Sequence, residues 1–449
     1  MKRRTPNESA VTIRELQTTR NDADAGESMF ALIERLYPIC RSITGEGNRQ
    51  TLAILGEQID IQTHEVASGT PVFDWTVPPE WNVREAWIKD PAGKKIVDFQ
   101  DHNLHVVGYS RPVHQTLSLE ALQPRLHSLP EQPDWIPYRT SYYNETWGFC
   151  VPDRLKNALA DGEYEVCIDA DLQPGHLTYG EVVLPGVTEE EFLFSTHICH
   201  PSLANDNLSG IAVATQLMRL LKQMKRRYTY RFLFIPGTIG SITWLALHAD
   251  AARRIRHGLV LSCVGDSGYP HYKRSRRGNA LIDQAVAHVL RHGAPQHAIQ
   301  EFSPYGYDER QYGSPGFNLP VGLFTRSPHG MFPEYHTSAD NLDLVRPEAL
   351  TDSLALLLDV IAVVEGNETY RNTQPMCEPQ LGRRGLYDSL GGTSDRKERQ
   401  LALLWVLNQS DGTRSLLDIA ERAGHPFHLI RDAADSLLLH ELLAVEVAE

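Results

Sequence analysis

The sequence predicts an α/β protein whose core is a sheet covered by helices on both faces. Between about residues 147 and 366, strand-like segments alternate with amphipathic segments of helical periodicity. Several of the strand-like segments are mostly apolar, as strands buried on both faces are: EFLFSTHI, YRFLFIP and GLVLSCVG. This alternation is typical of a three-layer αβα domain.

Other parts of the 449-residue chain have a different pattern. Residues 62–129 contain short alternating runs separated by turn-forming residues, which predicts a small β-rich domain inserted into the α/β domain. The α/β domain itself is predicted over 27–61 and 130–370. Residues 380–449 follow the helix-turn-helix-strand order of a winged helix. Residues 1–26 are polar and are predicted to be a loosely ordered leader.

The charge balance argues against nucleic acid as a partner. The chain carries 43 Lys and Arg against 57 Asp and Glu, a net charge of −14 that repels phosphate backbones. Residues 380–449 hold eight basic and eleven acidic residues, and the second helix of the predicted helix-turn-helix carries only Arg431 against Asp432 and Asp435. We therefore expect the winged helix or the β-rich insert to mediate docking, including homo-oligomer formation.

The apolar segments and the cysteines indicate a cytoplasmic protein. No stretch approaches the ~18 consecutive apolar residues of a membrane-spanning helix. The six cysteines are scattered, without CxxC spacing, as expected of reduced thiols.

The densest group of chemically active side chains is the segment STHICHPSLANDNLSG, residues 195–210. It follows a predicted strand and leads into a helix, which is where open α/β sheets bind ligands. His197, His200 and Asp206 together offer the nitrogen and oxygen ligands that zinc takes. Asp206 or Asn207 could instead simply cap the helix. Capping alone needs neither histidine, so we interpret the segment as metal-binding.

A second group lies in EYHTSADNLD, residues 334–343. His336 has carboxylates on both sides, and a carboxylate that binds an imidazole fixes its tautomer for metal binding. The alternative is that Ser338, Asp340 or Asn341 caps the following helix. Taken alone, this segment does not decide between the two.

Together the two segments resemble the di-zinc aminopeptidase superfamily. Asp206-Asn207-Leu208-Ser209-Gly210 is similar to its Asp-Asn-x-Ser-Gly motif, and Tyr335-His336-Thr337 to its Tyr-His-Thr motif. Four segments resemble more closely a family of bacterial aminopeptidase-like proteins often associated with polysaccharide biosynthesis: LYPICRSITGEG, THICHPSLANDNLSG, YKRSRRGN and YDERQYGSPGFNLPVG.

The resemblance implies an aminopeptidase-like αβα core with a mixed sheet, an inserted β-rich domain and a C-terminal winged helix. It also implies one or two Zn²⁺ ions as cofactor. The implied ligands are His197 or His200, Asp206, His336 and Asp266, the last standing where the superfamily has a lone aspartate after a strand.

The sequence departs from the superfamily in two places. His197-Ile198-Cys199 stands where the superfamily has His-x-Asp, and His200 is a competing ligand, so both histidines remain candidates. The turn over residues 234–241 lacks the Glu-Glu pair that supplies a ligand and the general base. Glu309, next to Asp308, is our candidate for the base, and the alternative is a surface pair bound to Arg310.

A basic run and a tyrosine complete the candidate site. Lys273, Arg276 and Arg277 are suited to binding a substrate carboxylate or phosphate, although they could equally form a solvated loop. Tyr335 adjoins His336 and is expected to contact substrate. The predicted function is zinc-dependent hydrolysis of a peptide or other amide bond in a small substrate. The alternative is a catalytically altered binding or scaffold protein linked to polysaccharide biosynthesis.

Overall fold

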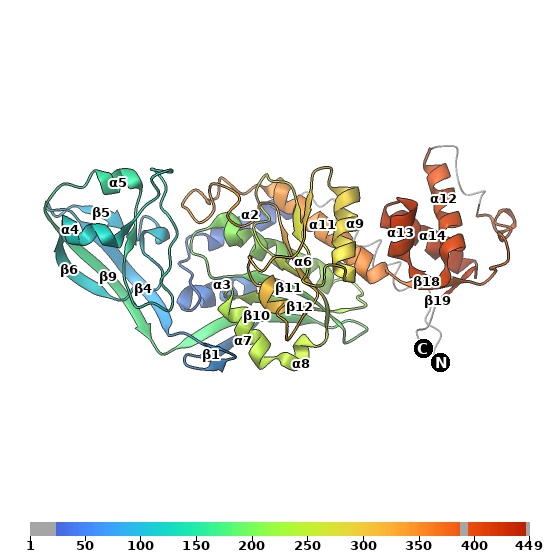
Figure 1. Cartoon of the computed structure of the whole chain (residues 1–449), viewed down its shortest axis with the longest axis horizontal. Coiled ribbons are helices and arrows are strands. Elements are labelled where there is room, and N and C mark those ends of the chain that lie inside the picture. Colours follow the sequence, from blue (N-terminus) through green and yellow to red (C-terminus); the bar gives the residue numbers. More distant parts are fainter. Residues whose placement is uncertain (1–23, 387–393, 446–449) are drawn as a thin grey trace.

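The protein has three parts arranged in a line. The computed structural model describes residues 24–386 and 394–445. Figure 1 shows a β-rich part at one end, an α/β part in the centre and a helical part at the other end. Residues 1–23 of the predicted leader lie outside the described residues, and helix α2 begins at Asp24.

The central part is built on an eight-stranded mixed sheet. Strand β11 lies parallel to β12 and β13, and β13 lies parallel to β16, whereas β10 and β14 join the sheet in antiparallel pairs. The strands in sheet order are β1 (Gln62–Ala67), β10 (His176–Leu184), β12 (Thr229–Ile235), β11 (Glu191–His197), β13 (Ile255–Leu261), β16 (Val321–Thr325), β14 (His271–Lys273) and β15 (Ala298–Gln300). Every residue of β11 is buried, as predicted for a strand covered on both faces.

Helices cover both faces of this sheet. Phe192 packs with α2, α6, α9 and α11 on one face, while Leu193 packs with α7 on the other, because successive side chains alternate across a strand. The helices of this part are α2 (Asp24–Leu36), α3 (Glu46–Gly56), α6 (Gly210–Lys222), α7 (Ile239–Leu247), α8 (Ala249–Ala252), α9 (Leu281–Gly293), α10 (Glu309–Tyr312) and α11 (Pro347–Gly366). The predicted αβα architecture with a mixed sheet is confirmed.

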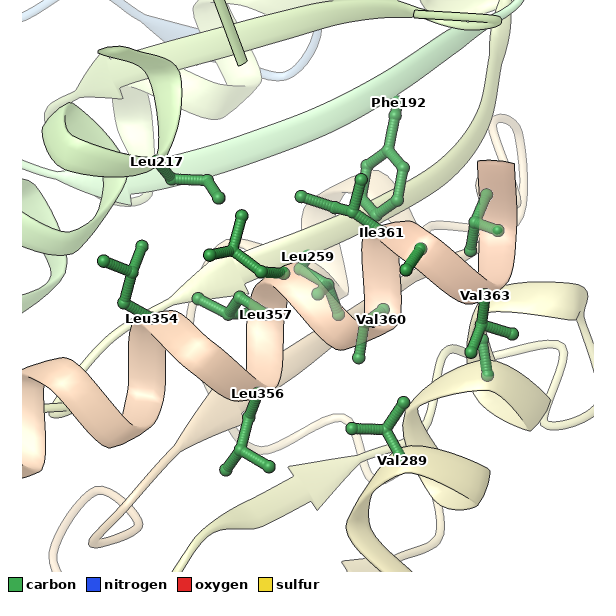
Figure 2. Close-up of a cluster of buried hydrophobic side chains, with 14 of the residues drawn as sticks. Phe192, Leu217, Leu259, Val289, Leu354, Leu356, Leu357, Val360, Ile361 and Val363 are labelled. Atoms are coloured by element: carbon green, nitrogen blue, oxygen red, sulfur yellow. The ribbon is translucent and has the colours of Figure 1, made fainter. Parts of the chain in front are cut away.

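Helix α11 is apolar on most of its surface because it packs against two neighbours. Figure 2 shows Ile361 beside Phe192 of the sheet, and Leu356 on the side of the helix that faces Val289 of α9. All four side chains are buried. Burial of one large aliphatic or aromatic side chain contributes about 1.5–3 kcal/mol to the free energy of folding. The contacts of α11 with the sheet and with α9 therefore hold this helix in place.

The β-rich insert contains a four-stranded antiparallel sheet in the order β5-β4-β9-β6. Its strands are β4 (Glu80–Lys89), β5 (Lys95–Asp98), β6 (Val113–Ser118) and β9 (Glu163–Gln173), and the shorter elements around it are β2 (Pro71–Val72), β3 (Trp75–Thr76), β7 (Leu126–His127), β8 (Phe149–Cys150), α4 (Leu119–Leu122) and α5 (Asp153–Asn157).

The insert therefore reaches beyond the predicted range of 62–129. Strand β1 pairs with β10 in the central sheet, and β9, which the sequence pattern assigns to the core, lies in the small sheet. Residues of β9 alternate between more and less buried, which is the pattern of a strand in a sheet with one solvated face.

The C-terminal part is a winged helix. It contains β17 (Thr369–Asn372), α12 (Ser394–Gln409), β18 (Asp411–Ser415), α13 (Leu416–Ala423), α14 (Phe427–Leu439) and β19 (Leu443–Val445), with the sheet order β18-β17-β19. It contacts α9 through Glu421, whose carboxylate lies 2.6 Å from both His288 Nδ1 and Arg291 Nη1. The described part of the chain has no helix long and apolar enough to cross a membrane.

Candidate metal centre

The candidate site lies at the carboxyl ends of the parallel strands. Strand β11 ends at His197, and the loop after it carries His200 and Asp206 before α6 begins. The segment after β16 carries His329 and His336. Because β11, β13 and β16 are parallel, these segments leave the sheet at the same edge.

The Asp206 carboxylate is surrounded by three imidazoles. His197 Nε2 lies 2.9 Å from Asp206 Oδ1, and His336 Nε2 lies 3.0 Å from Asp206 Oδ2. His200 Nε2 is 3.9 Å from the same Oδ2. Asp206, His197 and His200 are almost fully buried. The structure thus brings four of the five predicted metal ligands together.

The unsatisfied atoms of this cluster fit a metal ion. His336 Nε2 and Asp206 Oδ2 face each other at 3.0 Å, and neither atom makes a hydrogen bond with any other described residue. Buried polar atoms with so few partners are rare and costly, and imidazole nitrogen and carboxylate oxygen are ligand types that zinc takes. His197, His200 and Asp206 offer ligand atoms within 4.8 Å of one another.

The protonation states also suit metal binding. Burial lowers the pKa of His200 well below its usual value, so its imidazole is neutral and its lone pair is available. Burial opposes ionisation of Asp206, but His200, His197 and His336 hold the pKa of this carboxyl well below its usual value. Arg41, also buried, donates from Nε to the carbonyl oxygen of His200 at 2.9 Å and so fixes the backbone at this ligand.

Two aspartates hold the loop that carries Asp206. Asp340 accepts hydrogen bonds from the backbone N–H groups of Asn205 at 2.6 Å and Asp206 at 2.9 Å. Asp266 accepts from Asn205 Nδ2 at 2.7 Å and from Ser327 Oγ at 2.8 Å. The structure therefore places Asp266, the fifth predicted ligand, beside the loop and not among the imidazoles.

Cys263 and His329, in contrast to Asp266, lie close to Asp206. Together with Asp206 they form a second group whose ligand atoms all lie within 4.8 Å of one another. The sequence interpretation did not select either residue. Cys263 lies only two positions after β13, and His329 lies in the loop before the Tyr-His-Thr motif. Their closeness to a strand end and to a recognised motif is the signal in the sequence that could have identified them as ligands.

A pocket of about 330 Å³ opens beside the cluster. Most of the residues in its wall are tyrosines and histidines, and the full wall is formed by Tyr138, Thr140, Tyr142, His200, Gly237, Thr238, Tyr305, Gly306, Tyr307, Arg310, His329, Tyr335 and His336. Tyr335 is thus on the wall, as predicted for a substrate-binding residue.

The predicted basic residues lie elsewhere. Lys273 is buried, forms an ion pair with Glu309 and donates to the carbonyl oxygen of Tyr305 at 2.7 Å. Arg276 Nη1 donates to the Asn318 side chain at 2.9 Å, and Arg277 Nε donates to the carbonyl oxygen of Asn318 at 2.8 Å. None of the three basic residues is among those that line the pocket.

Glu309, the predicted base, lies directly behind the pocket wall. Its carboxylate is buried and accepts from the Tyr307 backbone N–H at 3.0 Å in addition to pairing with Lys273. A Cβ atom at Gly306, which lines the pocket, would lie 2.0 Å from Glu309 Oε1. A single glycine therefore separates this carboxylate from the pocket.

The turn that lacks the Glu-Glu pair is covered by an aromatic ring. A Cβ atom at Gly237 would lie 1.9 Å from Tyr307 Cε1, so a side chain there would overlap the ring. The Tyr307 ring lies 4.2 Å from that of His197, centroid to centroid. Its hydroxyl is 3.4 Å from Cys199 Sγ, which in turn is 3.4 Å from His200 Nδ1. Tyr307 and Cys199 thus support the histidines where the superfamily has carboxylates.

The chain matches a family model over most of its length. Residues 30–367 match a domain of unknown function, DUF4910. The chain belongs to the DUF4910 family. Residues 368–445 match a winged helix-turn-helix model, in agreement with the C-terminal part described above.

The relatives agree with the predicted resemblance. A Clostridium acetobutylicum protein described as a candidate polysaccharide biosynthesis protein with an aminopeptidase-like domain is 50% identical over 424 residues, which cover 94% of this DUF4910 chain and 98% of the relative. A crystal structure of a candidate peptidase from Clostridium acetobutylicum has a TM-score of 0.92 and 48% identity, covering 96% of this chain and 100% of that one.

More distant structures share the fold. A zinc aminopeptidase from Bacillus subtilis has a TM-score of 0.56 at 13% identity and covers 75% of this chain and 94% of its own. A peptidase M28 precursor from Shewanella amazonensis has a TM-score of 0.57 at 14% identity, and the match covers 80% of this chain and 97% of that one. The aminopeptidase-like fold of the DUF4910 chain is thereby established.

Proposed function

We propose that this DUF4910 protein is a zinc-dependent hydrolase that cleaves a peptide or other amide bond in a small substrate. The observation that carries the proposal is the Asp206 carboxylate ringed by three imidazoles beside a pocket. The similarity to proteins named as aminopeptidases supports it, and the name of the Clostridium relative supports a place in polysaccharide biosynthesis.

His197, His200, Asp206 and His336 would hold the ion, and Cys263 with His329 offers ligands for a second ion that shares Asp206. A bound zinc ion supplies a Lewis acid for the amide carbonyl and lowers the pKa of a water ligand to about 7.

The chain itself positions these groups. Asp340 holds the backbone at Asp206, and Arg41 holds the backbone at His200. His200 and His336 lie on the pocket wall, so a substrate in the pocket would contact both. Glu309 remains the candidate proton acceptor, and its carboxylate lies next to Gly306 of the pocket wall.

A second candidate function is binding without catalysis. It is favoured by the Tyr307 ring, which occupies the space next to Gly237 where the superfamily's carboxylate pair is expected. The same metal ligands would then hold a structural ion.

Metal content separates the proposal from a site that binds no ion. Full-length protein purified without an affinity tag should contain at least one zinc ion per chain by inductively coupled plasma mass spectrometry. Asp206→Ala and His336→Ala should lose that zinc, whereas His114→Ala, which changes an exposed histidine of the insert, should keep it. A wild-type chain that stays metal-free after zinc is added would refute the hydrolase.

Turnover separates the two functions. A zinc-loaded chain that hydrolyses an acyl-amide or aminoacyl probe, and loses this activity in His336→Ala, would support the hydrolase. Full zinc occupancy without turnover of any amide in a broad library would favour the binding protein.

A further inference from the structure

The pocket wall carries one permanently charged side chain. Among the residues that line it, Arg310 alone is always charged at neutral pH, and no described lining residue is acidic. The remaining polar groups on the wall are histidine imidazoles, threonine hydroxyls and tyrosine hydroxyls, the tyrosines being Tyr138, Tyr142, Tyr305, Tyr307 and Tyr335.

Arg310 makes no side-chain hydrogen bond or ion pair within the described part of the chain. It lies on α10, where two other side chains are bound: Glu309 pairs with Lys273, and the Tyr312 hydroxyl lies 2.9 Å from Ser195 Oγ. The preceding Asp308 is buried and bonds with Ser241 at 2.7 Å. The helix is therefore fixed on both sides of Arg310, and its exposed side chain faces the pocket with unused donors.

This arrangement discriminates between classes of amide substrate. An aminopeptidase substrate presents a free ammonium group next to the scissile amide, and a desolvated ammonium group needs a carboxylate partner. The described wall offers no carboxylate, and Arg310 would repel the ammonium group. A guanidinium instead binds a carboxylate or a phosphate through two parallel hydrogen bonds.

We propose that the substrate is an acylated amine that carries an anionic group, a carboxylate or a phosphate, and that Arg310 binds this group while the amide lies at the histidine cluster. This inference rests on the proposed hydrolase function and names its substrate class. In the reaction the amide C–N bond breaks, the oxygen of water joins the acyl carbon, and a proton passes to the leaving amine. The products are a carboxylic acid and an amine that still carries the carboxylate or phosphate group.

Four small probes test the substrate class on zinc-loaded full-length protein: N-acetyl-L-alanine, N-acetylaminoethyl phosphate, the neutral N-acetyl-L-alaninamide and the cationic L-alaninamide. Acetate or ammonia release gives kcat/KM. One of the two anionic probes should exceed the neutral probe by roughly 10- to 100-fold, the range expected of a charge-assisted bidentate contact. The better of the two identifies carboxylate or phosphate as the recognised group.

Variants assign that preference to Arg310. Arg310→Gln should remove this preference, lowering kcat/KM for the anionic probe more than for the neutral one. Arg310→Lys should retain part of the preference, because the positive charge remains but the two parallel hydrogen bonds of the guanidinium are lost. Arg256→Gln, which removes an exposed arginine paired with Glu190, should keep the full preference. Preference for L-alaninamide, or an unchanged anion preference in Arg310→Gln, would overturn the inference.

Failure of this inference can be told apart from failure of the hydrolase. Isothermal titration with N-acetyl-L-alanine and N-acetylaminoethyl phosphate needs no turnover. One of these probes should bind the wild type at least 10-fold more tightly than Arg310→Gln. Equal binding to both proteins overturns the anion site even if the enzyme hydrolyses amides, and Arg310-dependent binding without turnover retains the anion site while refuting the hydrolase. Zinc content should be the same in both proteins.

Discussion

Replacing Asp308 with asparagine is expected to change how the stability of the protein depends on pH. Asp308 is buried, and burial is the main reason that its pKa is raised to about 7; a hydrogen bond with Ser241 opposes the rise, Glu309 adds to it and Arg310 opposes it. The Ser241 hydroxyl lies 2.7 Å from both Asp308 Oδ1 and the Thr238 carbonyl oxygen. The hydroxyl can donate to only one of these two oxygens. If it donates to the Thr238 carbonyl, a protonated Asp308 can donate its own proton to the Ser241 oxygen, and both contacts are then hydrogen bonds.

The sign and size of the effect follow from the two protonation states. Between pH 4 and 7 the folded chain keeps the Asp308 proton and the unfolded chain does not, so the free energy of unfolding falls as pH rises. From pH 5.5 to the folded-state pKa of about 7 is about 1.5 units, and each unit corresponds to about 1.36 kcal/mol. The wild type should therefore lose about 2 kcal/mol relative to Asp308→Asn between pH 5.5 and 8.5.

Urea unfolding at the two pH values measures this difference. Both proteins are kept in a chelator so that metal occupancy does not vary, and coincident transitions by circular dichroism and tryptophan fluorescence justify the free energies. Asp250→Asn, a change to an exposed aspartate of α8, should differ from wild type by the same amount at both pH values. If Asp308→Asn also differs equally at both, Asp308 does not hold a proton in the folded protein and the reasoning fails.

Two further changes test packing and domain contact. Gly237→Ala should lower the free energy of unfolding by about 1–3 kcal/mol because its methyl group overlaps the Tyr307 ring, and Tyr307→Leu in the same chain should relieve part of that loss; strictly additive urea-unfolding values would contradict this. Glu421→Gln should weaken the association of the winged helix with the central part by about 1–2 kcal/mol, since it weakens the contacts of this residue with His288 and Arg291. Limited proteolysis should then separate the winged helix from the central part faster than in wild type, and an unchanged rate would count against the contact.

The sequence pattern predicts the architecture better than it predicts which strands pair. Alternating apolar strands and amphipathic helices suffice for the αβα core, because burial on both faces shapes the composition of each strand. The segment of β9 satisfies the same criteria as a core strand, yet it pairs with β4 and β6 of the insert. A strand's partner is set by chain topology and long-range packing, which a local pattern does not contain.

The site shows the same division. His197, His200 and Asp206 are close in sequence, so a local motif predicts their grouping, and the geometry of the cluster agrees. Cys263 and His329 reach Asp206 only through the parallel order of the strands. The burial of Glu309 with Lys273 likewise depends on helix α10 and strand β14 meeting behind Gly306, which no single segment encodes.

The close approach of Tyr307 to Gly237 limits the evolutionary routes open to this site. A chain with Tyr307 favours glycine at position 237, and a glutamate side chain there would overlap the ring. Losing the ring first removes a support from His197 and Cys199 before any carboxylate replaces it. The two positions are thus coupled, and a carboxylate at position 237 requires a simultaneous change at position 307.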